Sequence, residues 1–250
     1  MWAKERHQRI LAMLATNQQV NANDLAGILS VSRETVRRDL LDLEEAGQVN
    51  RVHGGAVLPE PRSEEPFRQR MSARIRAKKE IARKAVDLIQ PGQTIMVDAG
   101  TTTALFGQEL AKLTGVSVIT NSLDIAMTLQ SAGKEVLMLG GRMARDVPAT
   151  VGELTLSEIR RFHADLCFSA PVAVHPTKGA FFYDLQEAEI AMAMFAQVRK
   201  AIILADHRKL GETSRVQSWE IGAIGALVTS RGARPEHIEA FRHAGVQLLQ

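Results

Sequence analysis

Short apolar runs separated by helix-like segments fill the chain from Thr94 onward, and they constrain its fold more than any other feature. Each run has the length of one buried strand, and the segments between them suit helices. Strands that alternate with helices form a mainly parallel sheet that is covered on both faces. We therefore expect a Rossmann-like α/β domain. The runs are Thr94–Val97, Val116–Thr120, Val136–Leu139, Leu166–Phe168, Ala201–Ala205 and Ala226–Thr229.

The loops after these strands are the expected ligand site, because ligands of parallel sheets bind at the carboxyl ends of the strands. One loop leads through a glycine and three threonines into a helix N-terminus, whose free N–H groups attract anions. Two further loops and a late lysine add hydroxyls, an amide and cations. The residues are Asp98, Gly100, Thr101, Thr102 and Thr103; Thr120, Asn121 and Ser122; Gly140, Gly141 and Arg142; and Lys209 in the loop 206–209.

Each loop taken singly is also explained by ordinary helix capping. Their repetition along one sheet edge favours a bound ligand. The chain lacks the GxGxxG pattern of dinucleotide sites and the Walker loop of nucleotide triphosphate sites. A phosphate-bearing polyol therefore suits these loops better than a dinucleotide.

The first sixty residues predict three helices with a tight turn between the second and third. Ile10, Leu11 and Leu14 recur at helical spacing, which gives a first helix of about 12 residues. Residues 21–24 are good capping types for a second helix that ends at Leu29. Ser32 then caps a third helix, with Gly47 as its stop.

The third helix has the pattern of a recognition helix. Val36, Leu40 and Leu43 share one face, which leaves Arg37 and Arg38 on the opposite side. Arginines in the first half of a helix that follows a tight turn can reach bases or phosphates from the major groove. The alternative is a solvated face on which the arginines pair with nearby acids.

Residues 48–57 alternate and then reach two glycines, as a small hairpin does. A hairpin directly after a recognition helix forms a wing. Arg51 and His53 would then meet the sugar-phosphate backbone of DNA. Helix, turn, helix and wing in this order favour DNA binding over the solvated alternative.

The net charge of +3 is too small to indicate nucleic-acid binding by itself. Residues 1–60 carry 7 Lys+Arg and 8 Asp+Glu, whereas residues 61–90 carry 9 and 4. The excess positive charge therefore lies in residues 61–90, after the first domain. Within that domain, the acids Asp39, Asp42, Glu44 and Glu45 gather in the second half of the third helix, away from the arginines.

The run 32–40 and the run 51–56, together with Arg6, Ile10 and Leu14, resemble the DNA-binding signature of the DeoR family of transcription factors. The resemblance implies a winged helix-turn-helix that binds double-stranded operator DNA. Asp39 is better explained as a structural partner of a neighbouring arginine. The DNA-binding positions are Ser32, Arg33, Thr35, Arg37, Arg38, Arg51, His53 and Gly54.

The second half resembles the DeoR effector domain, which is similar to sugar-phosphate isomerases. Its landmarks are the loops named above together with Gly152 and Glu187, and the resemblance adds Glu187 to the effector site. The family implies a repressor that binds a phosphorylated sugar or related metabolite and then leaves its operator. It also implies a homodimer or homotetramer, in keeping with two-fold operator half-sites.

One segment departs from the family. Ser169–Pro176 replaces a Gly-Ala-Asp-Gly-like loop and lacks the acid that an isomerase would use for proton transfer, which argues against catalysis. The aromatic run 181–183 lines the altered pocket or packs in the core. Two other functions stay open: a sugar-phosphate isomerase-like enzyme with an appended DNA-binding module, and a DNA-binding protein that responds to no ligand.

The expected domains are residues 1–58, which bind DNA, a linker over 59–75 marked by three prolines, and residues 76–250, which bind the effector. A basic helix from about Ser72 to Ile89 is expected to expose its cations, including Lys78, near DNA phosphates or simply to water. We expect no cofactor and no metal. The lone Cys167 and the absence of a signal or membrane segment predict a cytoplasmic protein.

Overall fold

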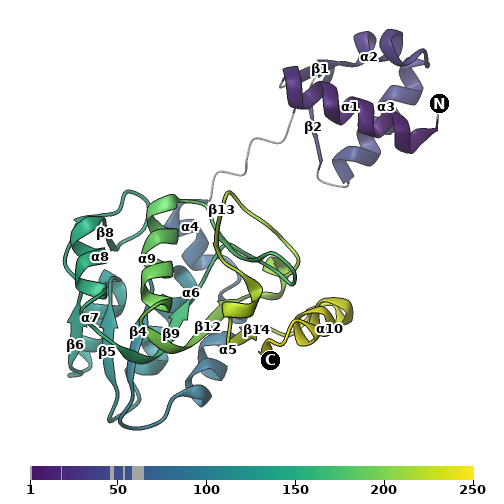
Figure 1. The fold of residues 1–250 in the computed structure, drawn as a ribbon. Helices are drawn as coiled ribbons and strands as arrows, with labels where there is room; N and C mark the ends of the chain where they lie inside the picture. Colours follow the sequence, from purple (N-terminus) through teal and green to yellow (C-terminus); the bar gives the residue numbers. More distant parts are fainter. Residues whose placement is uncertain (1, 18, 46–47, 53, 58–64) are drawn as a thin grey trace. The chain divides into compact units, whose positions relative to one another are not determined.

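The computed structural model describes residues 2–17, 19–45, 48–52, 54–57 and 65–250. The chain divides into two compact units, Met1–Glu65 and Pro66–Gln250 (Figure 1). Pro59 and Pro61, on which the expected linker depended, lie outside the described residues. Each unit has its own apolar core.

The first unit is a three-helix domain with a small antiparallel sheet. Its helices are α1 (Ala3–Asn17), α2 (Ala22–Leu29) and α3 (Arg33–Glu45). Its strands are β1 (Gln19–Asn21), β2 (Asn50–Val52) and β3 (Gly55–Val57), in the order β1-β3-β2. The three predicted helices and the hairpin are confirmed. The sequence missed β1, and the predicted stop at Gly47 lies outside the described residues.

The turn between α2 and α3 is short because side chains and a left-handed residue close it. At the opposite end of α2, the Asn21 side chain caps the helix by accepting a hydrogen bond from the Asn23 N–H at 2.8 Å. Ser30 ends this helix with a φ of 53°. The Ser32 hydroxyl accepts from the Thr35 N–H at 3.1 Å at the start of α3, as predicted.

The second unit contains a seven-stranded sheet with the order β15-β14-β12-β9-β4-β5-β6. All its neighbouring strands are parallel, so the predicted α/β class is confirmed. Six strands match the six apolar runs, and the sequence missed the seventh, β15. The strands are β4 (Thr94–Val97), β5 (Ser117–Thr120), β6 (Val136–Met138), β9 (Ala164–Ser169), β12 (Val198–Ala205), β14 (Ala226–Thr229) and β15 (Gln247–Leu249).

Helices cover both faces of this sheet (Figure 1). Ile95 and Val97 of β4 pack in one cluster with α5 (Ile75–Ala85), α6 (Thr101–Leu110) and α7 (Leu123–Ser131), whereas Met96 packs in the other. The second cluster contains side chains of α8 (Glu153–Ile159), α9 (Leu185–Phe195) and α10 (Pro235–His243). Successive strand residues point to opposite faces, and the covering helices require both to be apolar.

Two smaller sheets complete the second unit. β10 (Ala173–His175), β11 (Gly179–Phe182) and β13 (Val216–Trp219) are antiparallel, and β7 (Arg142–Met143) pairs with β8 (Thr150–Val151). The altered segment 169–176 is therefore the end of β9 followed by β10. Phe181 and Phe182 are buried, and Phe182 lies edge-on to Trp219 with centroids 5.8 Å apart. The aromatic run thus packs in the core at these two positions.

The basic segment after the proline-rich stretch forms two helices instead of one. α4 (Phe67–Ser72) lies within the range expected for the linker, and α5 begins only at Ile75. Arg74, with a φ of 52°, separates them. Because of this turn Lys78 is buried, with 4% of its surface exposed, and the expectation that it is exposed is wrong.

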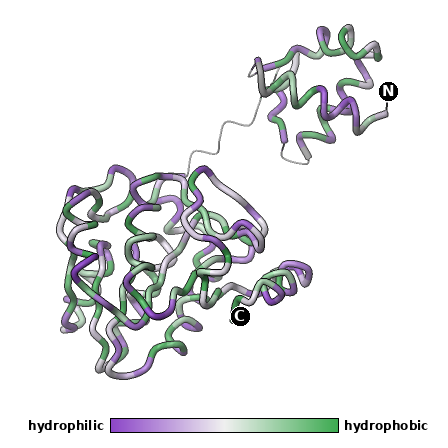
Figure 2. Tube along the Cα trace, viewed as in Figure 1, coloured by the Kyte–Doolittle hydropathy of each residue, from purple (hydrophilic) through white to green (hydrophobic). Residues whose placement is uncertain are grey.

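The hydropathy colouring separates the strands of the large sheet, which are mostly hydrophobic, from α10, which is largely hydrophilic (Figure 2).

None of the helices in the described ranges combines the length and the apolar character that crossing a bilayer requires.

Candidate DNA-binding surface and effector crevice

In the first unit, α3 and the β2–β3 hairpin enclose a hollow of about 530 Å³. Three of the predicted arginines line it, namely Arg33 and Arg37 from α3 and Arg51 from β2. Gly54 and Gly55 lie at its hairpin side. The sequence placed these side chains on one surface, and the structure brings them together. His53, also predicted here, lies outside the described residues.

Arg37 and Arg38 are exposed on α3, while Val36 and Leu40 are buried beneath them. Within the ranges that the structure describes, neither arginine lies within ion-pair distance of a carboxylate. Arg51 differs, since its Nε lies 3.7 Å from a Glu44 oxygen. The helix-surface pairing that was the alternative to DNA contact is therefore not formed by the described acids.

Asp39 joins the back of α3 to α1. Both of its carboxylate oxygens accept from Arg6, at 2.7 and 2.8 Å, and one lies 3.1 Å from His7 Nε2. Burial alone would raise the pKa of Asp39, but Arg6 and then His7 outweigh it and hold this pKa below its usual value. Asp39 is thus the structural partner of an arginine, as its place in the sequence suggested.

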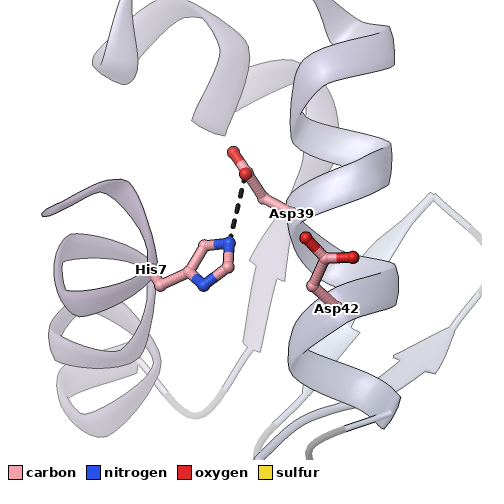
Figure 3. A group of neighbouring side chains, drawn as sticks. All are labelled: His7, Asp39 and Asp42. Carbon is pink, nitrogen blue, oxygen red and sulfur yellow. Dashed lines mark hydrogen bonds and ion pairs between the residues drawn. The ribbon is translucent and has the colours of Figure 1, made fainter. Parts of the chain in front are cut away.

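His7, Asp39 and Asp42 each offer one ligand atom within 4.8 Å of the others (Figure 3). That spacing would suit a metal ion. The Arg6 guanidinium already bonds both oxygens of Asp39, and its charge opposes a second cation at the same carboxylate. We therefore interpret Arg6, His7 and Asp39 as a hydrogen-bonded network that fixes α3 against α1.

The second unit has a switch point between β4 and β9. After β4 the chain continues to β5 and β6 on one side of the sheet, whereas β9 leads to β12 and β14 on the other. Ligands of open parallel sheets bind outside the strand ends at such a point. Here the Ser169 hydroxyl, at the end of β9, donates to Asp98 Oδ2 at 2.7 Å, just after β4.

Asp98 is buried, and burial raises its pKa to about 7 although hydrogen bonds from Ser169 and the Ala99 N–H act in the opposite direction. The carboxyl group thus changes its charge near neutral pH. The sequence named Asp98 but not Ser169, whose role depends on two strands 71 residues apart in the chain.

Helix α6 starts directly at the switch point. Gly100 is its N-cap residue and has no side chain with which to cap the first N–H groups. Thr101, Thr102 and Thr103 follow and are all buried, and the Thr103 hydroxyl donates to the Gly100 carbonyl at 3.0 Å. An uncapped helix N-terminus is suited to an anion.

The second predicted loop is partly used for structure. The Thr120 hydroxyl donates to the Val97 carbonyl at 2.6 Å and accepts from the Ser122 N–H, while Ser122 caps α7. Asn121 donates to the Thr150 carbonyl at 3.1 Å, but its Oδ1 atom is buried without a partner among the described residues. That amide oxygen suits a hydroxyl donor of a ligand.

The third loop contacts a carboxylate that the sequence analysis missed. The Gly140 N–H donates to Glu158 Oε2 at 2.6 Å, and a Cβ on Gly141 would lie 2.0 Å from the Thr155 hydroxyl. Gly141 is therefore explained by its close packing on α8, whereas a Cβ on Gly140 would lie at an ordinary contact distance of 3.4 Å from Glu158. Arg142 is exposed and donates at 2.9 Å to Gln186, which precedes Glu187 in the first turn of α9.

Lys209 reaches back toward the switch point. Its ammonium group donates to the Pro171 carbonyl, just beyond β9, at 2.7 Å. In the same loop, Asp206 lies 3.6 Å from Arg74 Nη1. Lys78 from α5 belongs to this group of charges, and the sequence had placed it on the surface.

Comparison with known proteins covers both units. Residues 6–62 match the DeoR-like helix-turn-helix domain, and residues 73–231 match the DeoR C terminal sensor domain. The HTH-type transcriptional regulator GolR of Listeria innocua is 32% identical over 98% of both chains. The glycerol-3-phosphate regulon repressor of Escherichia coli K12 is 28% identical over 90% of both.

Among solved structures, a ribose 5-phosphate isomerase A from Methanocaldococcus jannaschii is 20% identical. The structural match covers 53% of this chain and 52% of the isomerase chain, with a TM-score of 0.39.

Proposed function

The chain belongs to the DeoR family of transcriptional regulators, and from this premise we propose that it represses an operon for carbohydrate or related catabolism. In this proposal its first unit binds operator DNA. A phosphorylated small molecule binds at the β4–β9 switch point of its second unit and lowers the affinity for that DNA.

The observation that carries the DNA-binding half is the hollow lined by Arg33, Arg37 and Arg51. A concave surface with three guanidinium groups and a glycine-tipped hairpin matches the phosphate backbone and base edges of a duplex. Ser32 caps α3 by accepting from the Thr35 N–H, and both residues lie within two positions of Arg33 in the chain. We assign direct base contacts to Arg37 and Arg38, and backbone contacts to Arg51, His53 and Gly54.

The effector half is supported by the uncapped start of α6 beside a lysine. Anions bind at helix N-termini because the N–H groups and the helix dipole both favour negative charge. Lys209 adds a cation at the neighbouring strand end. The name of the E. coli relative refers to a phosphorylated polyol. We assign the polyol hydroxyls to Asp98 and to the Asn121 amide oxygen.

Release from DNA follows if the effector favours an arrangement of protomers that cannot span both operator half-sites. Such a ligand shifts a population only by its difference in affinity between the two arrangements. The proposed active species is a homodimer or homotetramer, because two-fold symmetric operators require two recognition helices.

The DNA-binding assignment is tested with Arg37→Ala and Arg38→Ala. The operator is first selected from a random duplex library, and binding is measured by fluorescence anisotropy. Loss of one base-reading arginine costs about 1–3 kcal/mol, which corresponds to a roughly 5- to 150-fold weaker Kd. Arg9→Ala is the control, because Arg9 is an exposed arginine of α1 that pairs with Glu5.

If both α3 variants bind the selected operator as tightly as Arg9→Ala does, the recognition-helix assignment is wrong. Gating is tested on the same complex by adding phosphorylated metabolites. A metabolite that binds the protein to saturation and leaves the operator complex intact contradicts release by that ligand.

A further inference from the structure

The cations of this chain are concentrated outside the unit that we assign to DNA. Residues 1–60 carry 7 Lys+Arg and 8 Asp+Glu, whereas residues 61–90 carry 9 and 4. Proteins that bind DNA neutralise its phosphates with lysine and arginine, so a unit with more acids than bases supplies few of these contacts. Helix α5, at the start of the second unit, has four Lys or Arg residues more than acids.

The apolar residues of α5 fix it to the large sheet and leave most of its cations outside. Ile81 and Ala85 are fully buried, in one cluster with side chains of β12 and β14. Arg76, Lys79 and Arg83 are spaced three and four positions apart, so they share the opposite, exposed face. Seven residues of helix separate the first of them from the last, which is a distance of about 10 Å.

A hollow of about 560 Å³ lies along this face, and we call it the α5 groove. Five cations and two acids line it together with Gln250, and none of these residues belongs to the effector crevice. The cations are Arg76, Lys79, Arg83, Lys84 and Arg231, and the acids are Glu80 and Asp87.

Part of the positive charge is already paired, because each acid of the groove lies beside one of its cations, at 3.0 and 3.2 Å. Arg83 lies 4.0 Å from Glu109, which is closer to Lys112. In the part of the chain that the structure describes, Arg76 and Lys79 have no carboxylate within ion-pair distance. Their two charges can therefore pair with an anionic partner without breaking an ion pair of the fold.

We propose that the α5 groove binds the phosphate backbone of the operator duplex, as a DNA-contacting surface of the sensor unit. This inference rests on the proposed DNA binding by the first unit. A DNA strand carries a phosphate about every 3.4 Å along the helix axis, so about three phosphates match the length of the row of cations. Contacts to phosphates carry no sequence information, and the choice of operator remains with α3.

The competing explanation is a solvated face, on which the cations of α5 contact only water and the acids beside them. Such a face leaves the number of phosphate contacts unchanged when two of its cations are removed. The two explanations therefore differ in the salt dependence of operator binding, which measures that number.

The test uses the full-length protein and the selected operator, placed in a duplex that is extended at both ends. Fluorescence anisotropy gives the Kd over a series of salt concentrations for the wild-type protein and for Arg76→Gln combined with Lys79→Gln. Each lost phosphate contact makes the slope of log affinity against log salt shallower by about 0.9, so we expect a change of about 1.8. Over a fourfold rise in salt, the wild-type protein then loses roughly tenfold more affinity than the variant.

Arg160→Gln combined with Arg161→Gln is the matched control. It removes the same charge from two exposed arginines at the end of α8, which packs on the other face of the sheet, and it should keep the wild-type slope. Circular dichroism and thermal melts verify that the variants are folded. If the double α5 variant does not fold, Lys79→Gln alone decides, with half the expected change in slope.

Equal slopes for the wild-type protein and the α5 variant overturn the inference and leave the recognition helix intact, because Arg37 and Arg38 are tested separately. An equal change in the α5 and control variants also overturns it, since net charge then explains the effect. If the wild-type protein selects no operator at all, the proposed function fails, and the inference fails with it.

Discussion

The pKa of Asp98 depends on two strand ends, because Asp98 follows β4 and its hydrogen-bond donor Ser169 ends β9. Its carboxyl group accepts hydrogen bonds from Ser169 and the Ala99 N–H, yet burial dominates and raises its pKa to about 7. In the unfolded chain the same group titrates near pH 4. The folded protein therefore holds this proton over a pH range in which the unfolded chain has lost it.

Because the folded state binds the proton more tightly, Asp98 contributes stability that is complete below about pH 4 and is lost as the pH rises through about 7. Asp98→Asn removes this dependence and keeps hydrogen-bonding groups for Ser169 and Ala99. We expect the Tm of the variant to exceed that of the wild-type protein by more at pH 8 than at pH 5. One pKa unit corresponds to about 1.4 kcal/mol, so the difference reaches a few kcal/mol.

Thermal melts at several pH values measure this difference. Asp146→Asn is the control, because Asp146 is exposed. Parallel curves of Tm against pH for the wild-type protein and Asp98→Asn would show that Asp98 is already ionised at pH 5.

At the level of single residues, the sequence predicted what depends on local periodicity. The exposed face of α3 is an example. The structural role of Asp39 was predicted from its place in the family motif, and its partner Arg6 lies 33 residues away. Lys78 was assigned to the surface because its neighbours form a regular basic helix in the sequence. The left-handed Arg74 interrupts that helix and turns Lys78 toward two carbonyls. No local sequence pattern predicts such a turn.

Among the elements, the hairpin of the first unit depends on one close backbone contact. Gly55 starts β3 and pairs with Asn21 and Val52 of its two neighbouring strands. A Cβ on Gly55 would lie 1.9 Å from the Val20 carbonyl oxygen. Only glycine allows β1 and β3 to approach this closely, and the hairpin forms one side of the hollow that we assign to DNA.

We expect Gly55→Ala to destabilise the first unit by about 1–3 kcal/mol, because the β1–β3 pairing must shift to admit a methyl group. Gly27→Ala is the matched control, since it lies within α2 with nothing within 4 Å of an added Cβ. It should stabilise the unit by about 0.5–1 kcal/mol. Urea unfolding measures both, and destabilisation by Gly27→Ala to the same extent would refute the steric explanation.

The elements that the sequence missed are those defined by distant pairing. β1 has three residues between two helices, and only its pairing with β3 makes it a strand. The β10–β11–β13 sheet likewise joins segments some forty residues apart. By contrast, six of the seven strands of the large sheet were visible as continuous apolar runs, and only the edge strand β15 was missed.

The molecule as a whole has separate cores in its two units. Leu14 belongs to the cluster formed by α1, α2 and α3, whereas Leu227 packs in the large sheet. The division into a DNA-binding part and an α/β part could be predicted from composition and periodicity. The charge group at Lys78 could not, because it assembles from α5 and the ends of two strands.

We expect Leu14→Ala to abolish operator binding at temperatures where phosphate binding persists. Removing a fully buried leucine side chain costs about 2–5 kcal/mol, and this loss falls on the first unit. Leu227→Ala should show the reverse order. Operator anisotropy and phosphate calorimetry, measured across the same temperature series, give both midpoints. Simultaneous loss of both activities in each variant would mean that the units unfold together.

The turn at Arg74 lies between α4 and α5, the first two helices after the DNA-binding unit. Its left-handed conformation costs about 1–2 kcal/mol relative to the right-handed one. The shortest covalent connection from Lys78 to the first unit therefore runs back through this turn and along α4, and it includes no strand of the large sheet.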